Sequence, residues 1–377
     1  MASYKKRGKT WQYEISFKRS DGKYDKIRKS GFKTKKEAQS VAEELEQNMK
    51  RGYKAHDKDI TLYEYFENWF SLYKEGKIAK ATELKYKDTL QSIEKFAPLQ
   101  TVRELDRATY QSLINSYAKT HAKGTVIKFN NHIRSCLKDA VEDGYILFDP
   151  TRKVVLGGDK PSKPKNEKYL DLDSYKKIIT IARSKLNPAS PSHYAIIMAG
   201  ATGMRVGEIL GITWDDLDFT EGSVNINKTW DYKFNSGFSK TKTESSIRKI
   251  YLDSSTLQIF KTYQQKQDEL FKANSVANEN KHVFFHPING VVTSSAINKA
   301  LKKICNDNNI SPSITVHGMR HTLASILLYK GISIYKVSRL LGHSSVATTQ
   351  NTYTHIIKEL DQEENKKITG IMDSIYK

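Results

Sequence analysis

Residues 316–355 read VHGMRHTLASILLYKGISIYKVSRLLGHSSVATTQNTYTH, and this stretch decides how the C-terminal half of the chain folds. Its apolar residues recur at intervals of three and four, which is the period of an amphipathic helix. They fall in two runs: Leu323, Ile326 and Leu327, then Ile334, Val337, Leu340 and Leu341. Gly342 directly follows the second run, at the place where a glycine ends a helix. The pattern predicts two packed helices with a further segment after them.

Polar residues suited to phosphate chemistry lie within and after these two helices. His317 and Arg320 form an H-x-x-R tetrad, His343 follows in L-G-H, and Tyr353 comes ten residues later. Arginine stays charged at any working pH and can donate two hydrogen bonds to phosphate oxygens, whereas histidine donates hydrogen bonds or moves protons. Tyrosine is a nucleophile that can hold a covalent phosphate ester. The stretch therefore predicts a site that acts on a phosphate.

Two motifs upstream add residues for the same chemistry. Arg205 stands just before a predicted short helix, and residues 231–246 have the composition of a long hairpin tip that carries Lys240 and Lys242. Cleavage of a phosphodiester requires cationic donors at the non-bridging oxygens, a nucleophile opposite the leaving oxygen, and an acid that protonates the leaving 5′-hydroxyl. Each motif is weak evidence for this chemistry when taken alone. The evidence becomes stronger when the motifs are taken together in their order along the chain.

Length and composition set the broad class. The chain has 377 residues, which favours two or three domains, and a formal net charge of +20. We expect a polyanionic partner, by default nucleic acid; the alternative is a merely soluble basic protein. The two cysteines, Cys136 and Cys305, are too few for a disulfide framework or a zinc site. No signal sequence or long apolar run occurs, so a reduced cytoplasm, without membrane contact, is expected.

The first 36 residues are strongly basic. They carry 13 lysines and arginines against three acidic residues, which is half of the excess charge of the whole chain. Four apolar residues alternate there with polar ones and predict a strand: Trp11, Tyr13, Ile15 and Phe17. Residues 20–22 predict a hairpin turn before a returning strand over 24–28, and Thr34 with Glu37 fits a capping box that opens a helix. We expect a small sheet backed by one helix, whose basic face either contacts phosphates or is simply solvated.

The remaining segments are read from their spacing. Residues 60–155 carry four apolar stripes at helical spacing and predict four helices, with Cys136 in their core. Residues 157–168, GGDKPSKPKNEK, have no periodicity and predict a linker. Alternation indicates strands within SVNINKTW (223–230) and within RKIYL (248–252).

Taken in order, the motifs A-T-G-M-R-V-G-E-I-L, a lysine hairpin, H-G-M-R-H-T, L-L-G-H-S-S and N-T-Y-T-H resemble the tyrosine recombinase (phage integrase) family over about residues 169–377. The resemblance implies six catalytic residues: Arg205, Lys242, His317, Arg320, His343 and Tyr353. It implies Glu208 as the acidic residue that supports Arg205. Lys242 is chosen because T-K-T-E-S-S-I-R-K-I fits the family's hairpin pattern, and Lys240 is the alternative.

The resemblance continues upstream. Residues 60–155 look like the family's helical core-binding domain, and the basic block before them looks like the arm-binding domain of integrases from temperate phages and integrative elements. The implied architecture is a multidomain α+β protein: a β-sheet-plus-helix arm-binding domain (1–56), an all-α core-binding domain (57–158), a linker (159–168), and a mainly α catalytic domain with a small antiparallel sheet and a C-terminal tail (169–377). A three-stranded sheet would enter the major groove. The expected DNA-binding residues are Lys5, Lys6, Arg7, Lys9, Lys18, Arg19, Lys26, Arg28 and Lys240.

The implied activity is site-specific recombination that integrates or excises a mobile element, either a phage genome or a conjugative transposon. Tyr353 attacks the phosphate to form a 3′-phosphotyrosyl bond, Lys242 protonates the freed 5′-oxygen, and the two arginines bind the phosphoryl oxygens. His317 helps to deprotonate the tyrosine or takes part in its return, and His343 hydrogen-bonds the phosphate. The ester retains the bond energy and the arginines take the place of a metal, so no cofactor, metal ion or ATP is expected.

The implied partners are double-stranded DNA, at core and arm attachment sites, and further copies of the chain in a homotetramer. An accessory bending protein and an excisionase are left open. The tail after Lys358 carries apolar residues at helical spacing, and we expect it to contact another subunit. Two rival functions are a type IB topoisomerase-like cleavage and rejoining, which the arm-like block disfavours, and a DNA-binding regulator that does not cleave.

Overall fold

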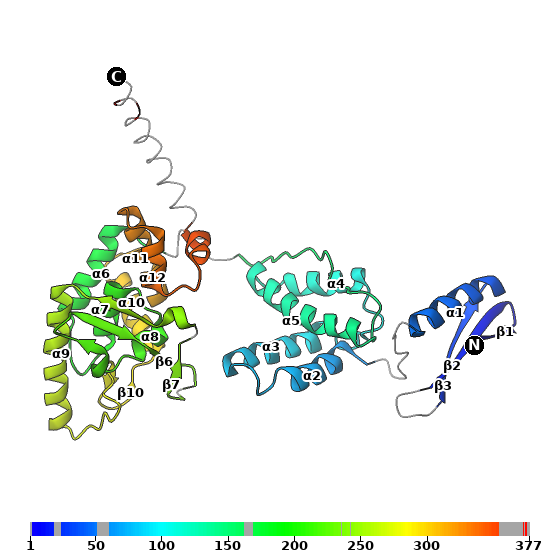
Figure 1. The fold of residues 1–377 in the computed structure, drawn as a ribbon, viewed down its shortest axis with the longest axis horizontal. Coiled ribbons are helices and arrows are strands. Elements are labelled where there is room, and N and C mark those ends of the chain that lie inside the picture. The colour runs from blue at the N-terminus through cyan, green and yellow to red at the C-terminus, as the bar shows by residue number, and fades with distance from the viewer. Residues whose placement is uncertain are drawn as a thin grey trace. The chain divides into compact units, whose positions relative to one another are not determined.

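The computed structural model describes residues 2–18, 24–50, 60–161, 169–234, 236–241 and 243–353, together with Met372 and Ser374. The chain divides into two compact units, residues 1–162 and 163–377, and each unit combines helices with small antiparallel sheets (Figure 1). The mixed α+β class predicted from the sequence is therefore confirmed. None of the described helices is long and apolar enough to cross a membrane.

A three-stranded antiparallel sheet with one helix against it forms the N-terminal part of the first unit (Figure 1). The elements are β1 (Ala2–Arg7), β2 (Thr10–Lys18), β3 (Tyr24–Phe32) and α1 (Lys35–Lys50), with the strands in the order β1-β2-β3. Tyr13 and Ile15 of β2 form a buried core with Phe32, Ala38 and Ala42. The local sequence pattern predicted β2, the returning strand β3 and the helix. It did not predict β1, whose residues lack a clear apolar alternation; a third strand was expected only from the family resemblance.

The start of α1 corrects one local prediction. Thr34 Oγ1 accepts a hydrogen bond from the Glu37 N–H at 3.1 Å, as a capping box requires. The Glu37 carboxylate accepts from the Lys33 N–H at 2.9 Å, in place of the Thr34 N–H that the motif uses. Only half of the predicted box therefore forms. The predicted turn at residues 20–22 lies outside the described residues.

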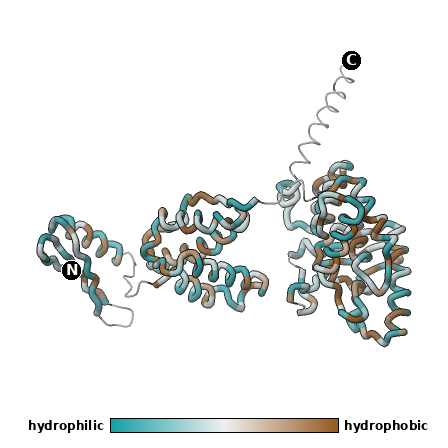
Figure 2. Tube along the Cα trace, turned by 180° about the vertical axis from the view of Figure 1, so that it is seen from behind, coloured by the Kyte–Doolittle hydropathy of each residue, from teal (hydrophilic) through white to brown (hydrophobic). Residues whose placement is uncertain are grey.

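The predicted helices of the region 60–155 form a bundle in the rest of the first unit. They are α2 (Leu62–Tyr73), α3 (Lys80–Phe96), α4 (Arg107–Ala118) and α5 (Lys123–Glu142). Hydrophobic residues recur along them between hydrophilic ones (Figure 2), and this spacing gives each helix one face for a common core. Phe66, Ile133 and the predicted core residue Cys136 are fully buried there.

The predicted linker begins on this bundle. The Asp159 N–H donates to Ala118 O at 3.0 Å, and the Lys160 N–H donates to His121 O at 3.4 Å. The segment has no apolar periodicity, but its first residues are nevertheless hydrogen-bonded to the helical bundle. Residues 162–168 lie outside the described part of the chain.

One buried helix, α7 (Ser192–Thr202), organises the second unit. It is apolar on all sides, so other helices must cover it. The helices that contact it are α6 (Leu172–Ser184), α8 (Val206–Leu210), α9 (Ser254–Ala273), α10 (Ser294–Asp307) and α11 (Val316–Tyr329). Gly203 and Arg205 follow the C-terminal end of α7, and the Gly203 carbonyl accepts a hydrogen bond from Arg320 of α11.

Short strands complete this unit. The strands β4 (Leu217–Asp218), β5 (Ser223–Ile226) and β8 (Arg248–Tyr251) form one sheet, and β6 (Lys228–Trp230) with β7 (Phe238–Lys240) and β9 (Phe285–His286) with β10 (Gly290–Val291) form two hairpins. The strands indicated within residues 223–230 and 248–252 are confirmed, and within the first stretch the chain passes from β5 to β6 at Asn227. The amide of Asn227 binds Asp216 Oδ1 at 3.0 Å, and Lys228 forms an ion pair with the same carboxylate.

The stretch 316–355 forms the two predicted helices, α11 and α12 (Ile334–Leu341), and residues 346–353 are helical as well. Gly342 ends α12 in the left-handed conformation, with φ 65°. One small core joins the three segments: Ala324, Leu328, Val337, Leu341 and Tyr353. This packing holds the predicted nucleophile against the helix that carries the H-x-x-R tetrad.

Candidate active site

The structure brings predicted catalytic residues from separate segments into one region of the second unit. The described members are Arg205, Glu208, His317, Arg320, His343 and Tyr353. Lys242 lies outside the described residues, and its alternative, Lys240, is exposed at the end of β7. In the described part of the chain, no group of His, Cys, Asp and Glu is arranged to hold a metal ion.

Backbone carbonyls at the ends of two helices hold the predicted arginines. Arg320 donates from Nη1 to Gly203 O, after α7, at 2.8 Å and from Nη2 to Leu341 O, in the last turn of α12, at 2.7 Å. Arg205 donates from Nη2 to Gly342 O at 2.9 Å. Carbonyls at a helix C-terminus lack intrahelical partners and carry the negative end of the helix dipole, so they suit a guanidinium. The two helix ends therefore fix two cations side by side.

Glu208 balances this positive charge. Its Oε1 accepts from Arg205 Nη1 at 2.7 Å, and its Oε2 accepts from Arg248 Nη2 at 3.0 Å. Burial alone would raise the pKa of Glu208, but the charge and hydrogen bond of Arg248, together with Arg205, lower it on balance. Burial and the nearby Arg205 lower the pKa of Arg320 to about 10, so Arg320 stays cationic at neutral pH.

Arg248 is a member of this network that the site prediction missed. Besides Glu208, it donates from Nε to Leu340 O at 2.6 Å and from Nη1 to Ser246 O at 3.0 Å. It thereby ties β8 to the end of α12 and to the carboxylate. The sequence did contain a signal for Arg248, because it is the arginine in the T-K-T-E-S-S-I-R-K-I pattern that follows the Ser/Thr-rich residues.

Tyr353 makes its hydrogen bond with a histidine that the prediction also missed. The Tyr353 hydroxyl lies 2.9 Å from His321 Nδ1, and the His317 ring lies 4.5 Å from the His321 ring between centroids. His317 and His321 are four residues apart and so share one face of α11, which the H-x-x-R-H sequence indicated. The structure therefore places His321, and not His317, in hydrogen-bond contact with the Tyr353 hydroxyl.

Burial and the arginines also lower the pKa values of the two predicted histidines, His317 and His343. Burial, then Arg320 and Arg205, lower the pKa of His317. The same causes lower the pKa of His343 to about 4, and His343 Nδ1 lies 2.7 Å from Thr349 Oγ1. A neutral imidazole carries one N–H and one free lone pair. His343 can therefore hydrogen-bond an oxygen at neutral pH without adding charge.

Substitution of Gly342 tests whether the backbone at the end of α12 is needed to position Arg205 and Arg248. A Cβ at Gly342 would lie 2.8 Å from Arg248 Nη1, and its left-handed φ costs another residue about 1–2 kcal/mol. We expect Gly342→Ala to destabilise the second unit by more than that amount and to slow cleavage, because Gly342 O holds Arg205. Hydrogen exchange of peptides from this unit would measure the loss. Gly331→Ala is the control, since Gly331 is also left-handed but has open space around it; equal losses in the two variants would contradict the expectation.

The predicted DNA-binding residues of the first unit are mostly exposed. The exposed ones on or beside β1 and β2 are Lys5, Lys6, Arg7, Lys9 and Lys18. Lys26 and Arg28 on β3 pair with Glu14 at 2.7 and 2.6 Å, and their hydrogen bonds lower the pKa of Glu14 to about 2. Arg19 lies outside the described residues. The lysines and arginine of β1 therefore carry more uncompensated charge than those of β3.

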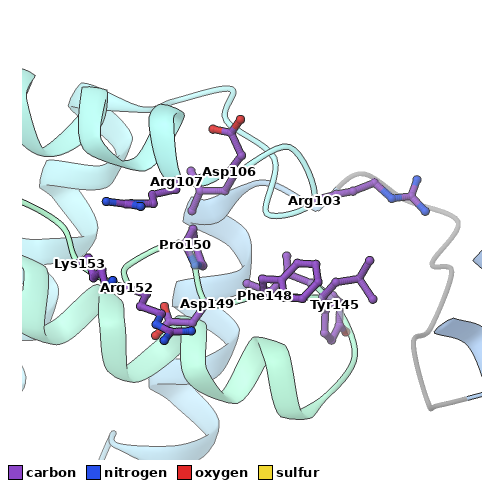
Figure 3. Close-up of a pocket in the computed structure, with 12 residues that line it drawn as sticks. Arg103, Asp106, Arg107, Tyr145, Phe148, Asp149, Pro150, Arg152 and Lys153 are labelled. Atoms are coloured by element: carbon purple, nitrogen blue, oxygen red, sulfur yellow. The ribbon is translucent and has the colours of Figure 1, made fainter. Parts of the chain in front are cut away.

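A cavity of about 670 Å³ lies in the first unit between residues 103–107 and 145–153 (Figure 3). Arg103 and Arg107 line it together with Phe148, whose side chain is largely exposed. Of the predicted catalytic residues that the structure describes, none lines this cavity. It is therefore not the active site.

Sequence comparisons find two matching family models and several related proteins. A family model described as the phage integrase family matches residues 168–359, just over half of the chain, and an arm DNA-binding domain model matches residues 2–49. A protein named tyrosine recombinase XerC-like, from Caldanaerobacter subterraneus subsp. tengcongensis, is 28% identical over 88% of this chain and 88% of its own length. The integrase of Staphylococcus phage L54a is 25% identical over 88% of this chain and 99% of its own length.

Solved structures share the fold. The Tn1549 transposon integrase in complex with transposon right end DNA matches with a TM-score of 0.67 at 19% identity, covering 82% of this chain and 100% of that one. A lambda integrase tetramer bound to a Holliday junction matches with a TM-score of 0.57 at 17% identity, covering 90% of this chain and 91% of that one. At these identities the structures support the fold, and the family rests on the sequence match. The chain belongs to the phage integrase family and is a tyrosine-type site-specific DNA recombinase.

Proposed function

We propose that this chain is the integrase of a mobile element and that it cleaves and rejoins attachment-site DNA through a 3′-phosphotyrosyl intermediate on Tyr353. One observation carries the proposal. Backbone carbonyls at the ends of α7 and α12 bind Arg205 and Arg320, and Tyr353 packs against α11 and α12. Two fixed cations and a tyrosine supply the charge and the nucleophile that phosphodiester cleavage needs.

Each residue has a role in the proposed reaction. Tyr353 Oη attacks the scissile phosphorus while the bond to the 5′-oxygen breaks, and Arg205 and Arg320 bind the non-bridging oxygens. His343 donates a hydrogen bond to the phosphate. Lys242, or Lys240 at the end of β7, protonates the leaving oxygen. The freed 5′-hydroxyl of a partner duplex then attacks the phosphotyrosine and releases the enzyme.

The proposal includes partners beyond the single chain. The match of residues 2–49 to an arm DNA-binding domain, together with the exposed cations of β1, supports a second DNA contact at arm sites. The lambda integrase tetramer on a Holliday junction supports a homotetramer for this chain as well. An accessory bending protein and an excisionase are further proposed partners. The tail after Lys358, apart from Met372 and Ser374, lies outside the described residues, and its role in subunit contacts stays a prediction.

Trapping the covalent intermediate tests this function. DNA spanning the ends of the protein's own element, nicked near the crossover, would be incubated with the wild-type chain in EDTA and then denatured. We expect a denaturant-resistant protein–DNA adduct, because the arginines supply the charge that a metal supplies elsewhere. Tight binding without an adduct would favour a regulator. Relaxation of supercoiled DNA without exchange between two sites would favour a topoisomerase-like enzyme.

The Arg320→Lys variant tests the phosphate-binding assignment. Lysine keeps the charge but cannot donate to Gly203 O and Leu341 O while also reaching a phosphate, since it lacks the planar fork. We expect the rate of adduct formation to fall by about 10²–10³-fold, as for loss of one oxyanion donor. Arg339→Lys is the matched control, because Arg339 is exposed on α12. A near wild-type rate for Arg320→Lys would remove Arg320 from the mechanism.

A further inference from the structure

We propose that His321 is the base that accepts the phenolic proton of Tyr353 during cleavage and returns it during rejoining. This inference rests on the proposed function, because it assigns a proton acceptor to the same nucleophile. Its basis is geometric. His321 Nδ1 lies 2.9 Å from Tyr353 Oη, and among the described residues it is the one hydrogen-bond partner of that hydroxyl.

Packing fixes this contact. Tyr353 exposes only 2% of its surface, and it is packed in a small core with Ala324 and Leu328 of α11. His321 lies on the same helix, one residue after Arg320. A base on a packed helix meets the nucleophile at one position and in one orientation, which proton transfer requires. The contact therefore joins the nucleophile to the segment that also carries the phosphate-binding arginine.

The environment of Tyr353 makes a base necessary. Burial raises the pKa of Tyr353 to about 12, although the nearby Arg320 acts in the opposite direction. The phenol is therefore protonated at neutral pH, and a protonated phenol is a weak nucleophile. In the tautomer that carries its proton on Nε2, His321 offers the Nδ1 lone pair to the hydroxyl.

His317 is less well placed for this step. Its ring meets the His321 ring at 81°, with 4.5 Å between centroids, and its pKa responds to Arg320 and Arg205 after burial. His317 also lies three residues before Arg320 on α11, and residues at that spacing are neighbours on a helix surface. His317 then serves the phosphate, and His321 serves the tyrosine.

The proton balance of the step is closed. As the Oη–P bond forms and the P–O5′ bond breaks, the phenolic proton moves to His321 Nδ1, and the leaving 5′-oxygen takes a proton from the hairpin lysine. In rejoining, a 5′-hydroxyl attacks the phosphotyrosine and loses its proton to that lysine. The departing Tyr353 oxygen recovers the proton from His321. No oxidant, reductant or further reactant is required.

Two substitutions at His321 separate a base from a structural contact. His321→Ala removes both functions. His321→Asn keeps a polar group near the position of Nδ1 but cannot take a proton at neutral pH. With the full chain at saturating concentration on nicked attachment-site DNA, we expect both variants to form the adduct about 10²-fold more slowly than wild type, within the range for a lost base. DNA binding is measured in parallel and is expected to be unchanged.

A more acidic nucleophile supplies the second readout. Incorporation of a fluorinated tyrosine at position 353 lowers the pKa of the phenol, so the reaction depends less on a base. We expect this replacement to speed adduct formation in His321→Ala and to have little or no such effect with His321 present. A wild-type rate in His321→Asn, or no rescue by the fluorinated tyrosine, would overturn the proposal. Absence of any adduct with the wild-type chain would instead reject the proposed function itself.

Discussion

Replacing Tyr353 by phenylalanine is expected to abolish the covalent protein–DNA adduct completely while leaving DNA binding intact. The variant loses only the hydroxyl, and with it the hydrogen bond to His321 at 2.9 Å. Loss of one such bond costs on the order of 1 kcal/mol, so the core around residue 353 should keep its packing. The phosphate would then meet the same arginines without a nucleophile. A denaturing gel of nicked attachment-site DNA, run beside a binding assay, measures both quantities.

A tyrosine nearby provides the matched control for this result. Tyr329 lies on the same helix as His317 and Arg320 but is 58% exposed, outside the buried core of Tyr353. Tyr329→Phe is expected to form the adduct at the wild-type rate. An adduct in the Tyr353→Phe variant would assign the nucleophile to another tyrosine and would also remove the basis for His321 as the base.

Local sequence patterns were sufficient to predict the elements that surround this site. The apolar spacing from Leu323 to Leu341 and the glycine after it define two helices and the end of the second, because both signals depend on neighbouring residues only. The same kind of pattern located strands within residues 223–230, which the structure divides into β5 and β6 at Asn227. At that break the Asn227 amide donates to Asp216, a residue outside the segment, so the local pattern does not reveal the contact.

The contacts within the site could not be predicted in this way. Arg320 binds the carbonyl of Gly203, 117 residues earlier, because α7 packs against α11. No local period encodes that packing. His321 was visible in H-x-x-R-H, but its role follows from Tyr353, 32 residues later. The family resemblance implied which residues take part in the reaction, and the structure adds Arg248 and His321, which hold or contact those residues.

Replacing Glu208 by glutamine is expected to have the largest effect on stability. Glu208 is buried and holds both Arg205 and Arg248, whose side chains are 37% and 8% exposed. Glutamine keeps the shape but removes the charge, so Arg248 would stay buried without a carboxylate. Breaking a buried ion pair from one side costs about 3–5 kcal/mol. We expect the free energy of unfolding of the second unit to fall by that amount, measured by hydrogen exchange of its peptides, and adduct formation to slow because Arg205 loses its support.

The stability difference between wild type and Glu208→Gln depends on pH if it comes from the charge of Glu208, and does not if it comes from the shape of the side chain. The folded structure lowers the pKa of Glu208, so its contribution is fully present above the unfolded value of about 4.3 and is lost as the pH falls through the lower folded value. The difference in unfolding free energy between wild type and Glu208→Gln should therefore be constant near neutral pH and shrink in acid. Glu221→Gln, which breaks a solvent-exposed pair with Lys249, should change stability far less at any pH. A Glu208→Gln difference that stayed constant into strong acid would mean that packing, and not charge, accounts for the loss.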